Sequence, residues 1–227
     1  MTTATAPLHC PTKEFDKLLN GSNYKFISED VLIYWQPREQ DYVVAHIEDQ
    51  PTYTKKDYYE LPEGAPYQLI NGKLIHTTAP TFDHQEICGT LFFLISLFLK
   101  KHPIGKTVFA PVDVEFNEKN VYQPDIVFIS NSRKHIIRER IEGAPDLVVE
   151  VLSPGSKAKD LGEKMETYGR YNVLEYWVVD PAEHSISLFE NRNGEMTETQ
   201  KTIRQGKLTS VVLEGFDMEV SDLFPAS

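Results

Sequence analysis

One carboxylate stands inside a stretch of the chain that otherwise has the composition of a buried β-strand. Residues 147–152 read Leu-Val-Val-Glu-Val-Leu, and Glu150 is the ionisable group among them. Burying an isolated carboxylate costs several kcal/mol or forces the group to take up a proton. Glu150 therefore needs a partner. An ordinary strand-end pair with a lysine would satisfy it, and so would a role as a metal ligand or an acid–base group.

The composition of the whole chain is that of a globular protein. Its 227 residues, 41% hydrophobic and 25% charged, are enough for one large domain, or for one domain with an extension. We expect residues 1–52 to be an N-terminal extension, partly flexible, and residues 53–227 to be the main domain. No window approaches the ~20 apolar residues needed to span a bilayer, so we expect no membrane partner.

The cysteines and the N-terminus indicate the compartment. Cys10 and Cys88 give no disulfide framework, and neither has a neighbouring cysteine or histidine at zinc-finger spacing. The opening sequence MTTATAPLHC lacks the basic region and apolar stretch of a secretory signal. A reducing cytoplasm fits these features best.

The charge of the chain limits how it can meet nucleic acid. A formal net charge of -11 argues against a protein that coats nucleic acid, because phosphate binding rests mainly on Lys and Arg. Residues 131–140 are locally basic, however, and more lysines follow soon after. This edge is either a solvated surface or a set of nucleic-acid contacts, for which the candidates are Arg133, Lys134, Arg138 and Lys157.

Hydrophobic periodicity and turn signals predict a mixed α/β domain, with a sheet between helices. Residues 31–35 and 42–47 read as two short strands, or as a strand and a helix. The elements predicted next are a short helix in 54–61, a hairpin turning at Asn71-Gly72, a core helix over 84–102, and strands over 107–116, 121–130 and 147–152. After these we expect a helix from Ser156 to about Asn172, a strand over 175–181, a hairpin turning at Asn193-Gly194, and a further strand from Lys207 with a short terminal helix.

A second carboxylate, Asp125, lies in the predicted strand before the one that carries Glu150. If these strands pair, their backbones lie about 4.8 Å apart, so both carboxylates can reach one point. Two ionised carboxylates about 4.5 Å apart repel by roughly 4 kcal/mol at an effective dielectric of 20. A shared proton or a divalent cation would relieve this repulsion, and Mg²⁺ or Mn²⁺ suits oxygen ligands. Asp146 is too far along the strand to share that ion.

The predicted helix after residue 156 carries polar residues at spacings of three and four, which form one continuous stripe. The stripe is either an amphipathic surface with tyrosine rings over the sheet or the border of the carboxylate pair. In the second case Lys164 would steady a water or a phosphate oxygen there. The residues of the stripe are Lys157, Asp160, Lys164, Tyr168 and Tyr171.

The pattern "QPDIVFIS…GAPDLVVEVLSP…D…K…Y…EYWVVDP" resembles the Uma-type restriction endonucleases, a bacterial family within the PD-(D/E)XK nuclease superfamily. The likeness spans roughly residues 53–181 and continues more loosely to the end. It implies a restriction-endonuclease-like mixed sheet flanked by helices, with extra C-terminal β-hairpins. It also implies that Asp125 is the acid of the "PD" element and that Glu150 is the second metal ligand.

The chain departs from the superfamily pattern at two positions. Leu152 stands where a lysine would follow the second acid, and the resemblance implies that the lysine comes from the next helix, as Lys164. Gln68, in "YQLING", stands where such proteins commonly carry Glu, and an amide brings no charge to a metal. His84 matches a recurrent family position, and we interpret it as a helix-cap histidine. Asp160 and Tyr168 complete the secondary site residues.

These features lead to a Mg²⁺-dependent DNA endonuclease with Asp125, Glu150, Lys164 and Gln68 as catalytic residues. The alternative is a weakened nuclease fold that serves as an interaction or regulatory module. A nuclease of RNA or branched DNA would share the chemistry. We also expect a homodimer, because exposed apolar strands in this architecture often pair.

Overall fold

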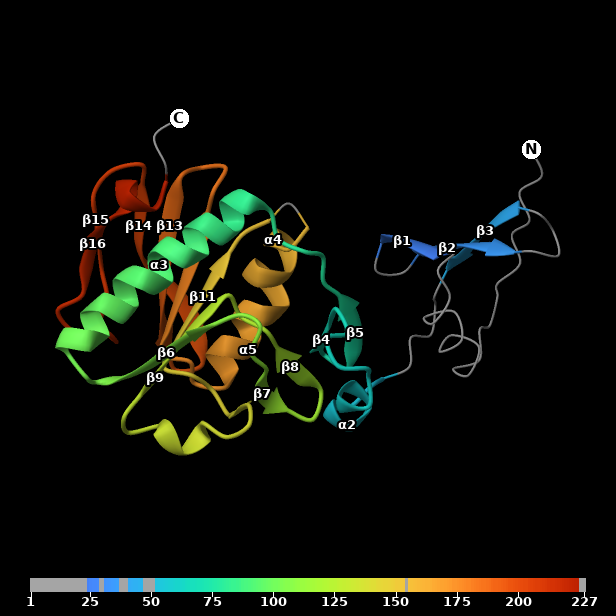
Figure 1. Cartoon of the computed structure of the whole chain (residues 1–227), viewed down its shortest axis with the longest axis horizontal. Coiled ribbons are helices and arrows are strands. Elements are labelled where there is room, and N and C mark those ends of the chain that lie inside the picture. The colour runs from blue at the N-terminus through green and yellow to red at the C-terminus, as the bar shows by residue number, and fades with distance from the viewer. Residues whose placement is uncertain (1–23, 29–30, 37–40, 47–51, 154, 225–227) are drawn as a thin grey trace. The chain divides into compact units, whose positions relative to one another are not determined.

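The structure is a computed structural model that describes residues 24–28, 31–36, 41–46, 52–153 and 155–224 (Figure 1). The chain divides into two compact units, Met1–Thr52 and Tyr53–Ser227. The first unit holds a three-stranded antiparallel sheet of β1 (Tyr24–Ser28), β2 (Val31–Gln36) and β3 (Asp41–His46). Both uncertain segments are therefore strands, and the helix alternative is wrong. The predicted flexibility of the extension concerns residues outside the described ranges.

The second unit is built on a six-stranded sheet with the order β14-β13-β12-β11-β9-β6. Its strands β11 and β12 are parallel and all its other neighbours antiparallel, so the predicted mixed sheet is confirmed. The predicted hairpin at Asn193-Gly194 extends this sheet, and positive φ angles of 58° and 94° suit its tight turn. The six strands are β6 (Gly105–Phe109), β9 (Ile126–Ser130), β11 (Leu147–Val151), β12 (Glu175–Asp180), β13 (Ser185–Arg192) and β14 (Glu195–Ile203).

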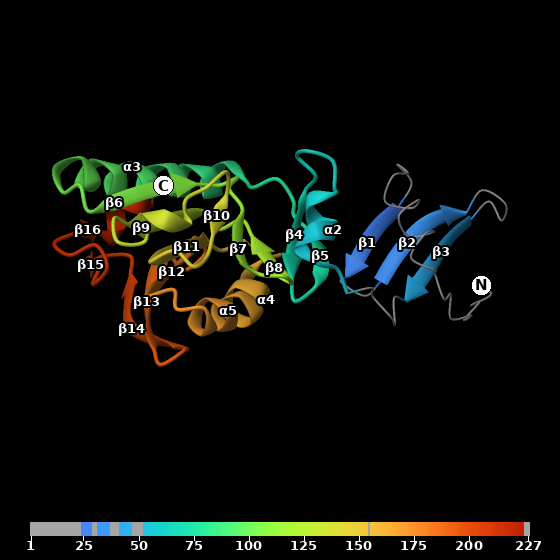
Figure 2. The same ribbon diagram turned by 90° about the horizontal axis from the view of Figure 1, so that it is seen from below.

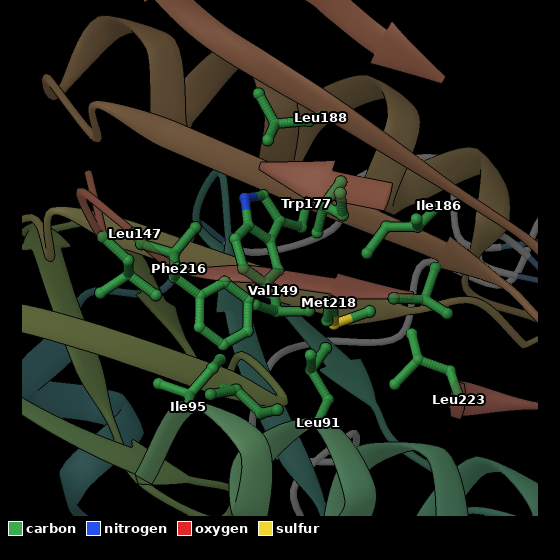
Figure 3. Close-up of a cluster of buried hydrophobic side chains, with 14 of the residues drawn as sticks. Leu91, Ile95, Leu147, Val149, Trp177, Ile186, Leu188, Phe216, Met218 and Leu223 are labelled. Atoms are coloured by element: carbon green, nitrogen blue, oxygen red, sulfur yellow. The ribbon is translucent and has the colours of Figure 1, made fainter. Parts of the chain in front are cut away.

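Helix α3 (Phe82–Lys101) covers one face of the six-stranded sheet, as Figure 2 shows. Its buried residues Leu91 and Ile95 pack on inward-facing strand residues such as Val149 and Trp177 (Figure 3). By length and composition alone α3 could cross a membrane, although the sequence shows no fully apolar window. Because its buried side chains pack in this core, we interpret α3 as a core helix of the domain.

A smaller sheet and a kinked helix cover the opposite face. The smaller sheet has the order β10-β7-β8-β4-β5, where β4 is Tyr67–Ile70, β5 Lys73–His76, β7 Val114–Asn117, β8 Asn120–Tyr122 and β10 Ile141–Glu142. The short helix α2 (Lys55–Tyr59) precedes it, and the helical turn η1 (Lys134–Ile136) follows β9. At the C-terminus come β15 (Lys207–Thr209), β16 (Asp217–Glu219) and η3 (Val220–Leu223).

Two predicted strands are each divided between the two sheets. Residues 107–116 contribute to β6 and β7, and residues 121–130 contribute to β8 and β9. Pro111 and Pro124 lie at the two breaks. Because proline has no N–H to donate to a strand ladder, it favours such a crossover between sheets. Asp125 therefore lies in the crossover and not within a strand.

The predicted helix of residues 156–172 is interrupted. It consists of α4 (Lys157–Lys159), the π-helical segment η2 (Asp160–Lys164) and α5 (Met165–Arg170), with non-helical angles at Gly162 (φ -114°, ψ -105°). Ser156 makes no helix-capping bond; its hydroxyl instead accepts a hydrogen bond from the Ser153 N–H at 3.0 Å. The expectation of one regular helix from Ser156 to about Asn172 is thus wrong, because a kink divides it at Gly162.

Candidate functional site

The register of two antiparallel strands brings Asp125 and Glu150 together. Strand β9 pairs with β11, and Ile126 lies opposite Val149. Asp125 directly precedes Ile126 and Glu150 directly follows Val149, so the two acids lie near each other at the end of this ladder. The Asp125 carboxylate contacts the Val151 N–H and His84 of α3, whereas Glu150 contacts Lys164 and Tyr168 of the kinked helix on the other face. The electrostatic effect of Asp125 on the pKa of Glu150 agrees with this proximity. The strand pairing therefore brings the two residues close together, and the expectation that both carboxylates reach one point stays a prediction.

Asp125 is held from two directions through one oxygen. Its Oδ2 accepts a hydrogen bond from the Val151 N–H at 2.7 Å and lies 3.3 Å from Nε2 of His84. Burial disfavours the imidazolium form, but the Asp125 carboxylate more than offsets burial and raises the pKa of His84 above its ordinary value. Within the described residues, Oδ1 of Asp125 accepts no hydrogen bond. One oxygen thus orients the carboxylate and leaves the other available.

Glu150 is also engaged through one oxygen. Its Oε1 accepts hydrogen bonds from the Lys164 ammonium at 2.9 Å and from the Tyr168 hydroxyl at 2.6 Å. Only 3% of Glu150 is exposed. This burial raises the pKa of Glu150, and Lys164 opposes the rise. No described residue donates to Oε2, so Glu150, like Asp125, keeps one oxygen without a partner among them.

The kinked helix supplies a buried cation to the site. The Lys164 ammonium lies 3.0 Å from Oδ1 of Asp160 as well as 2.9 Å from Glu150. Burial disfavours the ammonium, but the two carboxylates outweigh burial and raise the pKa of Lys164. Asp160 is itself buried, and its carbonyl accepts a hydrogen bond from the Tyr176 hydroxyl at 3.2 Å. Of the predicted stripe, Lys164 and Tyr168 therefore contact Glu150, and Asp160 contacts Lys164.

The other two members of the stripe lie elsewhere. The Lys157 ammonium donates to Oδ2 of Asp180 at 2.9 Å, and the Tyr171 hydroxyl accepts a hydrogen bond from the Asn117 amide at 2.7 Å. Asp160, Lys164 and Tyr168 keep their relation through the kink at Gly162, and the two ends of the stripe, Lys157 and Tyr171, contact other parts of the fold.

Gln68 lies beside the crossover that carries Asp125. Its side-chain oxygen accepts a hydrogen bond from the Gln123 N–H at 3.1 Å. The β4–β5 turn that follows Gln68 also reaches the kinked helix, because the Asn71 amide donates to Glu163 at 2.7 Å. The amide oxygen expected to touch a metal is thus already engaged in holding the chain two residues before Asp125.

His84 is not a helix cap. Thr81 is the N-cap of α3, and its hydroxyl accepts the hydrogen bond from the His84 N–H. The imidazole instead reaches Asp125 through Nε2 and lies 3.6 Å from the Cys88 sulfur through Nδ1. Sequence reasoning missed Cys88. The signal was present as His-x-x-x-Cys, a spacing that places both side chains on one face of a helix.

The predicted nucleic-acid contacts from residues 131–140 follow the end of β9 that lies away from Asp125. Arg133 is used within the fold: its guanidinium donates to the carbonyls of Ala144, Pro145 and Asn172 and lies 3.7 Å from Asp146. Lys134 and Arg138 are exposed. Of the predicted contacts in this segment, these two side chains are the exposed ones.

Comparisons with known proteins agree with this architecture. A crystal structure of a putative nuclease belonging to DUF820 from Anabaena variabilis superposes with a TM-score of 0.63 at 21% identity, covering 75% of this chain and 97% of that one. A search of curated proteins found no match. The likeness to the crystal structure confirms the restriction-endonuclease-like fold.

The family comparison gives the class of the chain. The family model of Uma2, described as "Putative restriction endonuclease", matches residues 56–221, which is more than half of the sequence. The family description implies hydrolysis of phosphodiester bonds in nucleic acid, and nucleases of this class generally use a divalent metal. The chain belongs to the Uma2 family of putative restriction endonucleases.

Proposed function

We propose that this chain is a Mg²⁺-dependent DNA endonuclease in which Asp125 and Glu150 hold the metal. The observation that supports the proposal is that the two acids lie near each other at the end of the β9–β11 ladder, with one oxygen of each carboxylate bound within the fold and the other without a donor among the described residues. Two such carboxylate oxygens at one end of a strand pair form the beginning of an oxygen-ligand site.

The residues fit a hard divalent cation. The available ligands are carboxylate oxygens, which Mg²⁺ and Mn²⁺ prefer to nitrogen or sulfur. The repulsion between Asp125 and Glu150 contributes to the raised pKa of Glu150. A cation between them would offset that repulsion and favour the ionised form. When bound, Mg²⁺ supplies electrostatic stabilisation of the charge that develops on the reacting phosphate.

The protein residues around the pair have separate roles in this proposal. Lys164 stays protonated and neutralises negative charge brought by a phosphate, because it is held between Glu150 and Asp160. Tyr168 fixes the rotamer of Glu150 through its hydroxyl. Gln68 acts on the position of Asp125 by holding the Gln123 N–H. Lys134 and Arg138 are the proposed contacts to the nucleic-acid backbone beyond the site. Lys157 of α4, which lies beside Asp180 at the end of β12, is a further proposed contact.

The test uses supercoiled plasmid DNA and the full-length protein with Mg²⁺ or Mn²⁺. Asp125→Asn keeps an oxygen to accept from Val151, and Glu150→Gln keeps an oxygen to accept from Lys164 and Tyr168. Both variants should fold but fail to nick or linearise the plasmid. Glu86→Gln, at an exposed position of α3, is the matched control and should cleave as the parent does. Cleavage by Asp125→Asn at the parent's rate would defeat the proposal.

A specific observation favours the alternative, an interaction or regulatory module. Gln68 brings no charge where related proteins commonly carry Glu, and Lys164 already compensates the charge of Glu150. The site therefore has less uncompensated negative charge to attract a metal than a site with three unpaired carboxylates. The two functions differ in Mn²⁺ binding. A nuclease should show a rise in melting temperature with Mn²⁺ that Asp125→Asn abolishes, whereas an interaction module should show neither the rise nor plasmid cleavage.

The choice of DNA and the homodimer remain parts of the proposal. DNA rests on the family description, and cleavage of duplex DNA in preference to an RNA of the same sequence would support it.

Strand β6 is the edge of the large sheet, with Val108 and Phe109 exposed on it, and the adjoining helix α3 exposes Phe93. Sedimentation of the full chain tests the dimer, since a monomer at all concentrations would contradict it.

A further inference from the structure

We propose that His84, Cys88 and Asp125 form a binding site for a thiophilic divalent metal such as Zn²⁺. The site lies between the first turns of α3 and the crossover before β9. It is distinct in ligand chemistry from the carboxylate pair, although it shares Asp125 with that pair. The inference concerns metal binding alone and does not depend on the proposed nuclease activity.

The geometry brings three kinds of ligand together. One nitrogen of His84, the sulfur of Cys88 and an oxygen of Asp125 all lie within 4.8 Å of one another. Zinc bonds of about 2.0 Å to nitrogen or oxygen and about 2.3 Å to sulfur, at tetrahedral angles, place the ligand atoms roughly 3.3–3.6 Å apart. A contraction of at most about 1.5 Å in the widest pair would therefore close the site.

The backbone already places these ligands. His84 and Cys88 are four residues apart on α3, so their side chains share one face of the helix. Asp125 is oriented by the hydrogen bond that its Oδ2 accepts from Val151 at 2.7 Å. The three side chains are all mostly buried, since 12% of the His84 side chain, 17% of that of Asp125 and 6% of Cys88 are exposed. A metal would therefore need little rearrangement of the chain.

The donor set selects the metal. Imidazole nitrogen and thiolate sulfur suit Zn²⁺, Co²⁺ or Ni²⁺, whereas Mg²⁺ prefers oxygen alone. Burial, with the nearby charges of Asp125 and Glu150, raises the pKa of the Cys88 thiol, so a metal that binds there must displace a proton from sulfur. Only ions with a strong affinity for thiolate do so near neutral pH. The same carboxylates favour a cation beside these ligands.

A simpler arrangement of the same residues is a chain of hydrogen bonds. The Cys88 thiol would donate to Nδ1 of His84, and Nε2–H of His84 would donate to Asp125, at the observed separations of 3.6 and 3.3 Å. This chain needs no metal and predicts no affinity for Zn²⁺. The two possibilities therefore differ in a quantity that can be measured directly.

The experiment titrates Co²⁺ into the full-length protein, reduced with a phosphine so that no added thiol competes. Cobalt in a site with one thiolate gives a sulfur-to-metal charge-transfer absorption in the near ultraviolet. The parent should show this absorption at one equivalent of Co²⁺, and Zn²⁺ should bleach it. Cys88→Ser should abolish the absorption, and His84→Asn should weaken Co²⁺ binding at least tenfold.

The other cysteine provides the matched control. Cys10 lies outside the described residues, and Cys10→Ser should keep the full absorption. Melting curves without metal establish that each variant is folded. If Cys88→Ser does not fold, His84→Asn tests the site independently. Absence of the absorption in the parent would overturn the proposal, as would its survival in Cys88→Ser or its loss in Cys10→Ser.

Discussion

The ammonium of Lys164 lies 2.9 Å from Oε1 of Glu150, and only 6% and 5% of the two side chains are exposed. The ion pair joins the centre of the large sheet to the kinked helix that covers it. Glu150 therefore receives a cation from the protein itself through one oxygen, and the candidate metal site uses the other. The pair is a structural contact and part of the proposed active site at once.

Removal of the cation alone should be costly. Lys164→Met leaves Glu150 and Asp160 buried without it, and breaking a buried pair in this way typically costs about 3–5 kcal/mol in the free energy of unfolding. The double variant Glu150→Gln/Lys164→Met should lose less than the sum of the single losses. Urea unfolding measures the stability losses of the single variants and of the double variant. Lys134→Met, at an exposed site, should change stability by less than about 0.5 kcal/mol, and additive losses would contradict the coupling.

The need for a partner at Glu150 could be predicted from sequence, because an apolar strand cannot hold a lone carboxylate. The partner could be predicted as well, since Asp160, Lys164 and Tyr168 follow each other at helical spacing of four and keep that relation through the kink. Local periodicity was sufficient here because these contacts lie within one helix and its neighbouring strand.

Other features depended on contacts that local patterns do not contain. The alternation of residues 107–116 and 121–130 runs through Pro111 and Pro124, so it does not show that each segment changes sheets there. Arg133 belongs to a basic cluster in sequence, but in the fold three carbonyls need its donors. The meeting of His84, Cys88 and Asp125 depends on how α3 crosses the sheet.

The ion pair of Asp180 and Lys157 predicts an effect of pH on stability. Burial opposes ionisation of Asp180, but hydrogen bonds from Lys157 and from the N–H groups of Ala182 and Glu183 lower its pKa below 3.8. A lowered folded-state pKa stabilises the fold above the unfolded pKa, and this contribution is lost as the pH falls through the folded value.

Asp180→Asn should therefore be less stable than the parent at pH 6, and the difference should shrink as the pH falls below about 4. Because 52% of the Lys157 side chain is exposed, solvent screens the ion pair and we expect a modest loss of stability. Thermal unfolding across this pH range measures it. A difference that stays constant down to pH 3 would show that Asp180 acts without its charge.

Two glycines should respond to alanine in opposite directions. A Cβ on Gly169 of α5 would lie 2.5 Å from the Gly194 carbonyl oxygen, in the turn between β13 and β14. Gly169→Ala should lower the free energy of unfolding by about 1–3 kcal/mol because helix and turn must separate. A Cβ on Gly89 of α3 meets nothing within 4 Å, so Gly89→Ala should stabilise by roughly 0.5–1 kcal/mol. Equal effects in chemical denaturation would contradict the close approach.

Glu175 is a buried carboxylate that binds four donors and no cation among the described residues. Its Oε2 accepts from the Ser210 hydroxyl at 3.0 Å and from the N–H groups of Val211 and Val212 at 3.0 and 2.8 Å. Its Oε1 accepts from the indole N–H of Trp177. Burial raises the pKa of Glu175. It lies opposite Leu147 in the β11–β12 pair, at the other end of β11 from Glu150.

Glu175→Gln can keep the three donors on one amide oxygen, but its NH₂ then faces the indole N–H, which loses its acceptor. An unsatisfied buried donor costs about 1–3 kcal/mol, so this variant should unfold at lower denaturant while plasmid cleavage is unchanged. Trp177→Phe removes the donor, and in the double variant the cost of the glutamine should fall by about 1 kcal/mol. Guanidinium unfolding of the four proteins measures this coupling. Strict additivity would show that the Trp177 bond contributes nothing to holding Glu175.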